Sequence, residues 1–259
     1  MIPEVISSAQ NPKIKQLVLL EEKSRARKDA GLFVVEGRRE LDHCLNAGYE
    51  ADSVFVCSEI AGGFKCPAGA KLFEVTKDVY SKIACRETTE GVVAEMKVRS
   101  LSLQDLKLPA NPLVVVLESV EKPGNLGAVL RSADAAGADA VIICDPLTDL
   151  FNPNLIRASI GAVFTVPTVS CTSSEAIAFL KKNDIRILTA QLQDSDVYYD
   201  SDMLHGTAIV MGTEATGLTD IWREAADAHI RIPMLGRLDS LNVSVSAAIL
   251  LFEAVRQRQ

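Results

Sequence analysis

The sequence predicts an α/β protein built from two domains. From residue 112 onward, strand-like and helix-like segments alternate, which is typical of a parallel sheet covered by helices. Within that half, the β-branched run at 113–117 suits a buried parallel strand. A stretch with two prolines and no long apolar run, RSLSLQDLKLPANP, precedes it. We therefore expect a smaller α/β domain at 1–99, a linker at 100–111 and a second domain at 112–259.

The first domain begins with a helix in this interpretation. Helical spacing of apolar residues predicts it over 11–28, with Asn11 as the N-cap and Pro12 at the first helical position. The remaining elements are expected as strands at 32–35, 53–57, 71–75 and 91–96, and as helices at 38–47 and 77–84.

The second domain is expected to contain a longer series of the same kind. Its strands are expected at 113–117, 140–144, 163–169, 185–190, 207–211 and 229–232, and its helices at 126–136, 173–182 and 243–257. Because helices separate most of these strands, the strands should pair in parallel.

Composition excludes several classes of protein. The longest apolar runs fall short of the roughly 18 to 20 residues of a membrane helix, and the N-terminus lacks the pattern of a secretory signal. We therefore expect a cytoplasmic protein with no membrane contact. The six cysteines are scattered and only three histidines are present, so we expect reduced thiols and no metal site.

Charge is distributed unevenly along the chain. The net charge of −7 argues against a protein that coats nucleic acid through charge alone. Residues 1–110 hold 16 basic and 16 acidic side chains, so the whole excess of negative charge lies in 111–259. Six basic residues gather between 13 and 28, as either a binding patch or a solvated helix face: Lys13, Lys15, Lys23, Arg25, Arg27 and Lys28.

A first motif, KPGNLGAVLRSADAAGADAV at 122–141, lies where a strand ends and a helix begins, as phosphate loops do. Its glycines match neither GxGxxG nor GxxxxGK[ST], so a dinucleotide or P-loop site is not supported. Asn125 and Arg131 remain to be explained, either as a cap and a surface arginine or as functional groups. Gly127 and Arg131 are four residues apart, so the guanidinium can approach a molecule lying on the loop.

Two further motifs follow in the second domain. IVMGTEATGL at 209–218 places Glu214 between two glycines, where it is either merely solvated or held beside a ligand that the backbone approaches closely. IRIPMLGRLDSLNVSVS at 230–246 places Ser240 and Asn242 before an apolar helix. One of them can cap that helix, but a cap does not account for the loop before them.

At these three motifs the chain resembles the SpoU, or TrmH-like, family of S-adenosylmethionine-dependent RNA ribose 2′-O-methyltransferases. The resemblance covers about 111–259 through NxGAxxRxAxxxG, GxExxGL and IPMxG…SLNVS. Through SxxNPxIK and FVVEGRRE, the first hundred residues resemble the family's substrate-binding domain, which has a ribosomal L30e-like fold. One departure lies between Glu118 and Pro123, where relatives often carry Asp-x-x-x-Asp-Pro, although a carboxylate is kept at the strand end.

The resemblance implies a trefoil-knotted α/β domain, a homodimer and S-adenosylmethionine as cofactor. It implies a catalytic set of Asn125, Arg131, Glu214, Ser240 and Asn242. It implies cofactor contacts from Thr189, Ala190, Gly212, Ile232, Met234 and Leu241. The basic patch, with Arg38 and Arg39, would then bind RNA phosphates. Ribosomal RNA is favoured over transfer RNA as substrate. The alternatives are a transfer RNA enzyme and a non-catalytic RNA-binding or ribosome-assembly protein.

The expected chemistry is methyl transfer to a ribose 2′-hydroxyl. Arginine side chains have a pKa above about 12, so Arg131 is expected to act as a charged clamp for phosphate and the forming alkoxide rather than as a base. Asn125, Ser240 and Asn242 would orient the ribose and Arg131, while Glu214 would pair with that arginine or its neighbours. The proton acceptor is left unassigned.

Overall fold

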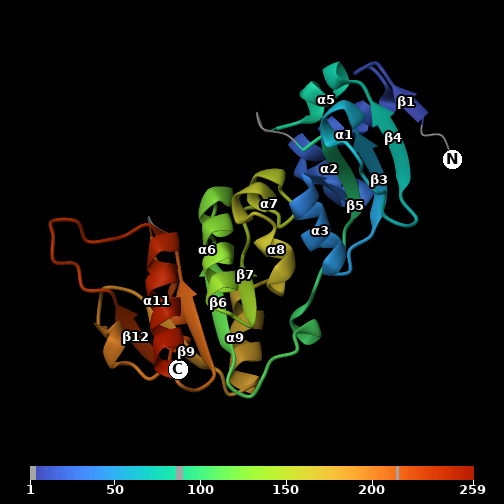
Figure 1. Ribbon diagram of the computed structural model, residues 1–259. Helices are drawn as coiled ribbons and strands as arrows, with labels where there is room; N and C mark the ends of the chain where they lie inside the picture. Colours follow the sequence, from blue (N-terminus) through green and yellow to red (C-terminus); the bar gives the residue numbers. More distant parts are fainter. Residues whose placement is uncertain (1–3, 86–89, 214–215) are drawn as a thin grey trace. The chain divides into compact units, whose positions relative to one another are not determined.

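The chain folds into two compact units in the computed structural model, which describes residues 4–85, 90–213 and 216–259 (Figure 1). The first unit comprises Met1–Arg99 and Asp149–Gly161, and the second comprises Ser100–Thr148 and Ala162–Gln259. The chain therefore changes unit after residue 99, at the start of the expected linker. It also returns to the first unit for a segment that the sequence had assigned to the second domain. Within the described part of the chain, no helix is long and apolar enough to cross a membrane.

The first unit is built on a mixed five-stranded sheet. Its elements are β1 (Glu4–Ile6), α1 (Pro12–Glu22), α2 (Ser24–Ala30), β2 (Leu32–Glu36), α3 (Arg38–Asn46), β3 (Ala51–Val56), α4 (Ser58–Ala61), β4 (Lys71–Val75), α5 (Lys77–Ile83), β5 (Val92–Lys97) and α7 (Pro153–Ser159). The strand order is β1-β4-β3-β5-β2. β4 pairs in parallel with β1 and β3, whereas β5 pairs antiparallel with β3 and β2.

The first predicted helix begins as expected but is divided in two. The Asn11 side chain accepts a hydrogen bond from the Lys13 amide at 2.9 Å, and Pro12 occupies the first helical position. At Lys23 the backbone becomes extended, with φ −116° and ψ 113°, and α2 starts at the next residue. The prediction of one continuous helix over 11–28 is therefore wrong. This break leaves carbonyl groups at the end of α1 that need other donors.

Arg27 supplies those donors and holds the returning segment. Its guanidinium donates to the carbonyls of Leu20 and Glu21 at 2.6 and 3.1 Å. It also forms an ion pair with Asp149, with Nη2 and Oδ2 2.5 Å apart, and only 4% of the arginine side chain is exposed. Two residues further on, Phe151 stacks on the ring of Phe33 with centroids 4.5 Å apart. Arg27 is thus a structural residue, and its predicted place in an RNA-binding surface is wrong because the side chain is buried and paired.

The second unit is built on a seven-stranded parallel sheet. Its elements are a 3-10 turn (Leu103–Asp105), β6 (Leu113–Glu118), α6 (Pro123–Ala135), β7 (Ala140–Cys144), α8 (Ala162–Thr165), β8 (Thr168–Cys171), α9 (Ser173–Lys182), β9 (Arg186–Ala190), β10 (Asp196–Val197), a second 3-10 turn (Tyr198–Asp200), β11 (Thr207–Met211), α10 (Asp220–Ala225), β12 (Ala228–Arg231) and α11 (Val243–Arg258). The order is β10-β12-β9-β11-β6-β7-β8. Every residue of β6, β7 and β11 is buried, as expected for strands covered on both faces.

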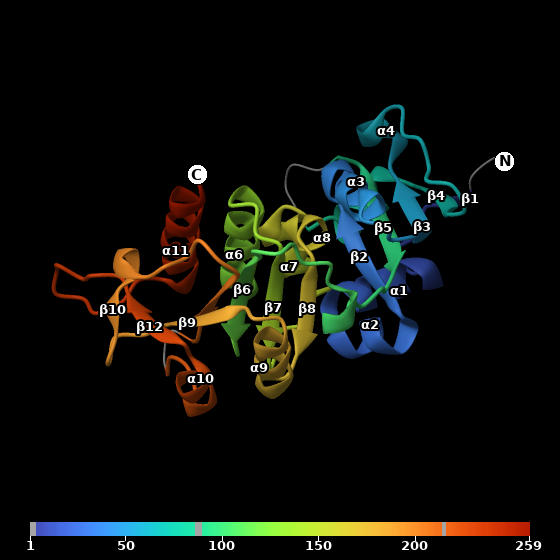
Figure 2. The same cartoon turned by 90° about the horizontal axis from the view of Figure 1, so that it is seen from below.

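Helices cover both faces of this sheet, and the parallel pairing places its loops. α6 and α11 lie side by side on one face, and α9 and α10 lie on the other (Figure 2). β11 pairs with both β6 and β9, and β12 pairs with β9. The carboxyl ends of these four strands therefore lie at one edge of the sheet, where the three motif loops begin. The trefoil knot implied by the family resemblance stays a prediction.

Two predicted boundaries in this unit differ from the structure. The run at 163–169 was expected as one strand, but Ala162–Thr165 forms a single helical turn and β8 starts only at Thr168. A short apolar run fits a buried helix as well as a strand, and Pro167 cannot donate to a ladder. α6 begins at Pro123, three residues earlier than expected, so Asn125 lies in the first turn of the helix rather than in a loop.

Loss of Arg27 should destabilise the protein strongly. We expect Arg27→Ala to lower the free energy of unfolding by about 3 kcal/mol, because the change leaves Asp149 and two carbonyls without their donor. Urea unfolding followed by circular dichroism measures this loss. Arg25→Ala is the matched control, since Arg25 is 93% exposed and should change stability by less than about 0.5 kcal/mol. Equal stability of the two variants would refute the role given to Arg27.

Candidate active site

The first and third motifs meet at the strand edge of the second unit. Asn125, in the first turn of α6, accepts a hydrogen bond at Oδ1 from Nδ2 of Asn242, with the two atoms 3.1 Å apart. Asn242 immediately precedes α11 and lies 117 residues further along the chain. Because α6 and α11 lie side by side, two amides that are distant in sequence are brought into direct contact.

The orientation of the Asn242 amide is fixed by the helix that it caps. Its Oδ1 accepts from the amide and the hydroxyl of Ser244, at 3.0 and 2.6 Å. An amide group has one oxygen acceptor and one NH₂ donor, so use of the oxygen by the cap directs Nδ2 toward Asn125. The capping role inferred from the sequence is confirmed for Asn242, which also contacts the first motif.

The other predicted catalytic residues are less closely associated. Arg131 is exposed on α6, and its guanidinium makes no hydrogen bond or ion pair within the described residues. The Ser240 hydroxyl is exposed and donates to Asp239 at 3.3 Å. Glu214 lies outside the described residues. The structure thus brings together two of the five, Asn125 and Asn242.

An open hollow of about 460 Å³ lies along the loop that follows β12. Two of the predicted cofactor residues, Ile232 and Met234, line it. Its other lining residues are Leu192, Arg231, Pro233, Gly236, Arg237, Leu238 and Asp239. Leu192 follows β9 and was not among the predicted cofactor residues, although the resemblance placed Thr189 and Ala190 of the same strand end in that site.

The remaining predicted cofactor residues lie at or near the same strand ends. The Thr189 hydroxyl is fully buried and hydrogen-bonded to Nδ1 of His229 at 2.6 Å, so its side chain is engaged with β12. Ala190 is half-buried at the last position of β9, and Leu241 is 39% exposed. At Gly212 a Cβ atom would come within 2.2 Å of the Gly217 carbonyl oxygen. The turn after β11 therefore requires glycine at this position.

A buried carboxylate fixes the residue that directly follows the second motif. Glu118, at the end of β6, is 3% exposed and accepts hydrogen bonds from the amide and hydroxyl of Thr219, at 2.8 and 2.5 Å. The Ser173 hydroxyl lies 3.3 Å from the same carboxylate, donates to Asp145 at 2.6 Å and accepts from the indole of Trp222 at 3.0 Å. This network fixes the chain directly after GxExxGL. The sequence showed only that a carboxylate stands at the strand end, because the partners come from two other segments.

The side chains of the predicted RNA-binding residues differ in how exposed they are and in whether they are already paired. Five are exposed: Lys15, Lys23, Arg25, Lys28 and Arg39. Lys13 is ion-paired with Glu4 at 2.7 Å and lies over the ring of Phe73. Arg38 donates to the carbonyl of Ala61 and is half-buried. The exposed five are called here the basic surface. Two of them also form ion pairs, Arg25 with Asp29 at 3.6 Å and Arg39 with Glu40 at 3.1 Å, but their side chains stay exposed.

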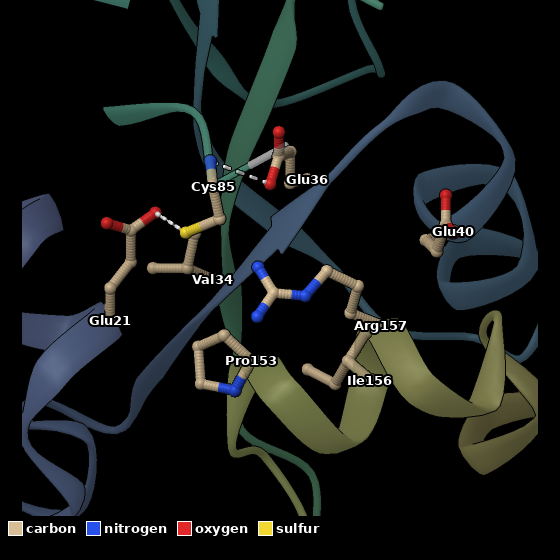
Figure 3. A pocket seen from close by; sticks show the side chains of 8 residues that line it. All are labelled: Glu21, Val34, Glu36, Glu40, Cys85, Pro153, Ile156 and Arg157. Carbon is tan, nitrogen blue, oxygen red and sulfur yellow. Dashed lines mark hydrogen bonds between the residues drawn. The ribbon is translucent and has the colours of Figure 1, made fainter. Parts of the chain in front are cut away.

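A pocket of the first unit lies beside the returning segment (Figure 3). Glu21, Glu36 and Cys85 line it together with Arg157 of α7. Burial, reinforced by the charge of Glu36, raises the pKa of Glu21 to about 8. Cys85 donates through its amide to Glu36 at 3.1 Å. The enclosed space is about the size of one water molecule, so we assign no ligand to this pocket.

The fold and the motif loops define a class of protein: an α/β protein whose parallel sheet gathers three motif loops at one strand edge, joined to a smaller α/β unit. The chain belongs to the SpoU rRNA Methylase family, whose profile matches residues 112–252. The profile of the MRM3-like substrate binding domain matches residues 11–94. The resemblance inferred from the three motifs is thereby confirmed, as is the α/β fold class.

Relatives match between about three quarters and almost all of the chain. The 23S rRNA (guanosine(2553)-2′-O)-methyltransferase RlmP of Bacillus subtilis is 28% identical over 247 residues, which cover 95% of this chain and 97% of that protein. The 23S rRNA (guanosine-2′-O-)-methyltransferase RlmB of Bordetella pertussis is 37% identical over 199 residues, covering 74% and 80%. The crystal structure of an AdoMet-bound rRNA methyltransferase from Sinorhizobium meliloti is similar with a TM-score of 0.88 at 29% identity, covering 98% of this chain and 97% of that one.

Two substitutions of Asn242 should separate its two contacts. Asn242→Ala removes the cap and is expected to lower the free energy of unfolding by about 1 kcal/mol. Asn242→Asp keeps a capping oxygen but has no Nδ2 to donate to Asn125, so its stability should stay within about 0.5 kcal/mol of the wild type. Chemical denaturation of both variants measures the difference. Equal destabilisation by alanine and aspartate would contradict the capping role.

Proposed function

We propose that this protein transfers a methyl group from S-adenosylmethionine to a ribose 2′-hydroxyl of ribosomal RNA. The observation that carries the proposal is the hydrogen bond between Asn125 and Asn242, which joins two family motifs at the strand edge. Membership of the SpoU rRNA Methylase family supports it. The names of the relatives, which are 23S rRNA 2′-O-methyltransferases, favour ribosomal RNA over transfer RNA as substrate.

The cofactor is assigned to the hollow beside the loop after β12. Its volume of about 460 Å³ falls within the roughly 300–1,000 Å³ of small-molecule sites. Apolar side chains such as Leu192 and Met234 suit an adenine ring, and Arg231 and Asp239 offer charges for an amino-acid tail. When bound, S-adenosylmethionine supplies an electrophilic methyl group. Backbone atoms at Gly212, Ile232 and Leu241 are proposed to hold it, and the AdoMet-bound relative supports this cofactor.

The substrate side of the site is assigned to Asn125, Arg131, Ser240 and Asn242. The guanidinium of Arg131 is exposed, and a guanidinium is suited to bind phosphate and to stabilise the alkoxide that forms as the hydroxyl loses its proton. Asn125, with its orientation set by Asn242, is proposed to position the ribose. Glu214 keeps its proposed role as a partner of Arg131 or its neighbours.

The first unit is proposed to bring the RNA to this site. It carries the match to a substrate binding domain, and its basic surface is suited to phosphate contacts. We further propose a knotted second domain, a homodimer and a cytoplasmic location. Exposed apolar side chains support self-association: Leu235 is 97% exposed, Leu238 80% and Phe252 48%.

Removal of the Arg131 side chain should affect chemistry rather than cofactor binding. We expect Arg131→Ala to lower the single-turnover rate of methyl transfer by about 100- to 1,000-fold, the usual effect of removing one group that stabilises a developing oxyanion. The Kd for S-adenosylmethionine, measured by calorimetry, should stay nearly unchanged. Arg223→Ala is the control, because Arg223 is an exposed helical arginine of the same unit, on the opposite face of the sheet. Weakened cofactor binding with retained turnover would contradict this assignment.

Charge reversal on the basic surface should weaken RNA binding. Lys15→Glu with Lys28→Glu is expected to raise the Kd for 23S rRNA fragments and to reduce the slope of log Kd against log salt by about 0.7–0.9 for each phosphate that the variant no longer neutralises. Lys181→Glu with Lys182→Glu changes the net charge equally on α9 and serves as the control. Filter binding over a salt series measures both pairs. Unchanged binding by the first pair at low salt would show that the basic surface is only a solvated helix face.

A further inference from the structure

Two cysteines of the second unit stand side by side on neighbouring strands. Cys144 is the last residue of β7 and Cys171 the last residue of β8, and the two are register partners in the parallel ladder. Both pack against the same apolar core, which includes Ala176 and Leu180 of α9. Adjacent strands lie about 4.7–4.9 Å apart, within the roughly 4.4–6.8 Å between Cα atoms that a disulfide spans. The Cα spacing therefore falls within the disulfide range, and bond formation requires the Cβ atoms to approach to about 3.5–4.5 Å.

The two thiols differ in accessibility. Cys144 is completely buried, whereas Cys171 is half-buried and belongs to β8, the last strand of the sheet. Cys171 also lines an open hollow of about 670 Å³, together with Leu103, Glu175 and Phe179. A small solute in this hollow can reach the sulfur of Cys171, while Cys144 lies behind it.

The two thiols also differ in acidity. The neighbouring thiol of Cys144 lowers the pKa of Cys171. The same neighbourhood, together with burial, raises the pKa of Cys144 above its ordinary value. Burial and the carboxylates of Glu175 and Asp145 act in the opposite direction at Cys171 but do not reverse the shift. The thiolate is the reactive form of cysteine, and the less buried thiol, Cys171, is the one whose pKa is lowered.

We propose that Cys171 and Cys144 form a redox-sensitive pair, in which Cys171 reacts with hydroperoxides and Cys144 closes a reversible disulfide. In the first step the Cys171 thiolate attacks a peroxide oxygen, so the O–O bond breaks, Cys171 becomes a sulfenic acid and the leaving oxygen takes a proton to give water or an alcohol. In the second step the Cys144 sulfur attacks the sulfenic sulfur, loses its proton and releases water. Two thiols are oxidised by two electrons and one hydroperoxide is reduced.

The other cysteines provide an internal comparison. Burial raises the pKa of the thiols of Cys44, Cys66 and Cys85, which makes each a weaker nucleophile at neutral pH. Cys85 is exposed. If exposure alone decided reactivity, Cys85 would be oxidised before Cys171. The proposal predicts the reverse order.

The test is peroxide oxidation of the full-length protein, followed by alkylation and peptide mass spectrometry. We expect a peptide linking Cys144 to Cys171, lost on treatment with dithiothreitol, while Cys85 remains alkylated. Cys85→Ser should form the link as the wild type does. Cys144→Ser should instead leave Cys171 as a sulfenic acid that dimedone traps. A folded wild-type protein that yields no such peptide, or that is oxidised first at Cys85, would overturn the proposal.

A second measurement does not depend on disulfide closure. Without peroxide, Cys144→Ala should slow alkylation of Cys171 by iodoacetamide at neutral pH, because the variant removes the neighbour that lowers the pKa of the Cys171 thiol. The thermal unfolding midpoint of each variant confirms that it is folded. A Cys171 that reacts equally fast in both proteins would show that Cys144 does not activate it. Neither measurement depends on methyl transfer, so the outcome is separate from the proposed function.

Discussion

Parallel pairing of β11 with β6 is the constraint on which the site depends. It places Met211 opposite Leu117, so that the turn after β11 and the loop before α6 start at the same edge of the sheet. β9 and β12 follow on the other side of β11, which brings the loop after β12 to that edge as well. This strand order is what brings Asn125 and Asn242 into contact. The substrate side of the proposed site rests on their contact.

Buried polar groups then fix the loops that the sheet gathers. Glu118 is buried at the end of β6, where its charge is tolerated because the amide and the hydroxyl of Thr219 donate hydrogen bonds to it. The same principle operates in the first unit, where Arg27 satisfies carbonyls left by the break between α1 and α2 and neutralises Asp149. In both units a charged side chain determines where a connecting segment lies, and neither charge is free to bind a substrate.

Local sequence patterns predicted much of the fold. Features that depend on contacts between residues far apart in the sequence were not predicted. The Asn11 cap, the β-branched run of β6 and the spacing of α9 are properties of neighbouring residues, so the sequence alone indicated them. The family motifs located Asn125 and Asn242 but not their hydrogen bond, which depends on strand order. The burial of Arg27 was not foreseen, because its partner Asp149 lies 122 residues away. Amphipathic spacing places a residue on a helix face, but it does not show what covers that face.

Mapping of ribose 2′-O-methyl groups in total RNA tests the central claim most directly. Cells with the gene, cells without it and deletion cells carrying the Arg131→Ala variant would be compared. The account predicts that one or more 2′-O-methyl groups in 23S rRNA vanish on deletion, return with the wild-type gene and do not return with the variant. An unchanged map of ribosomal RNA, or loss confined to transfer RNA, would contradict it.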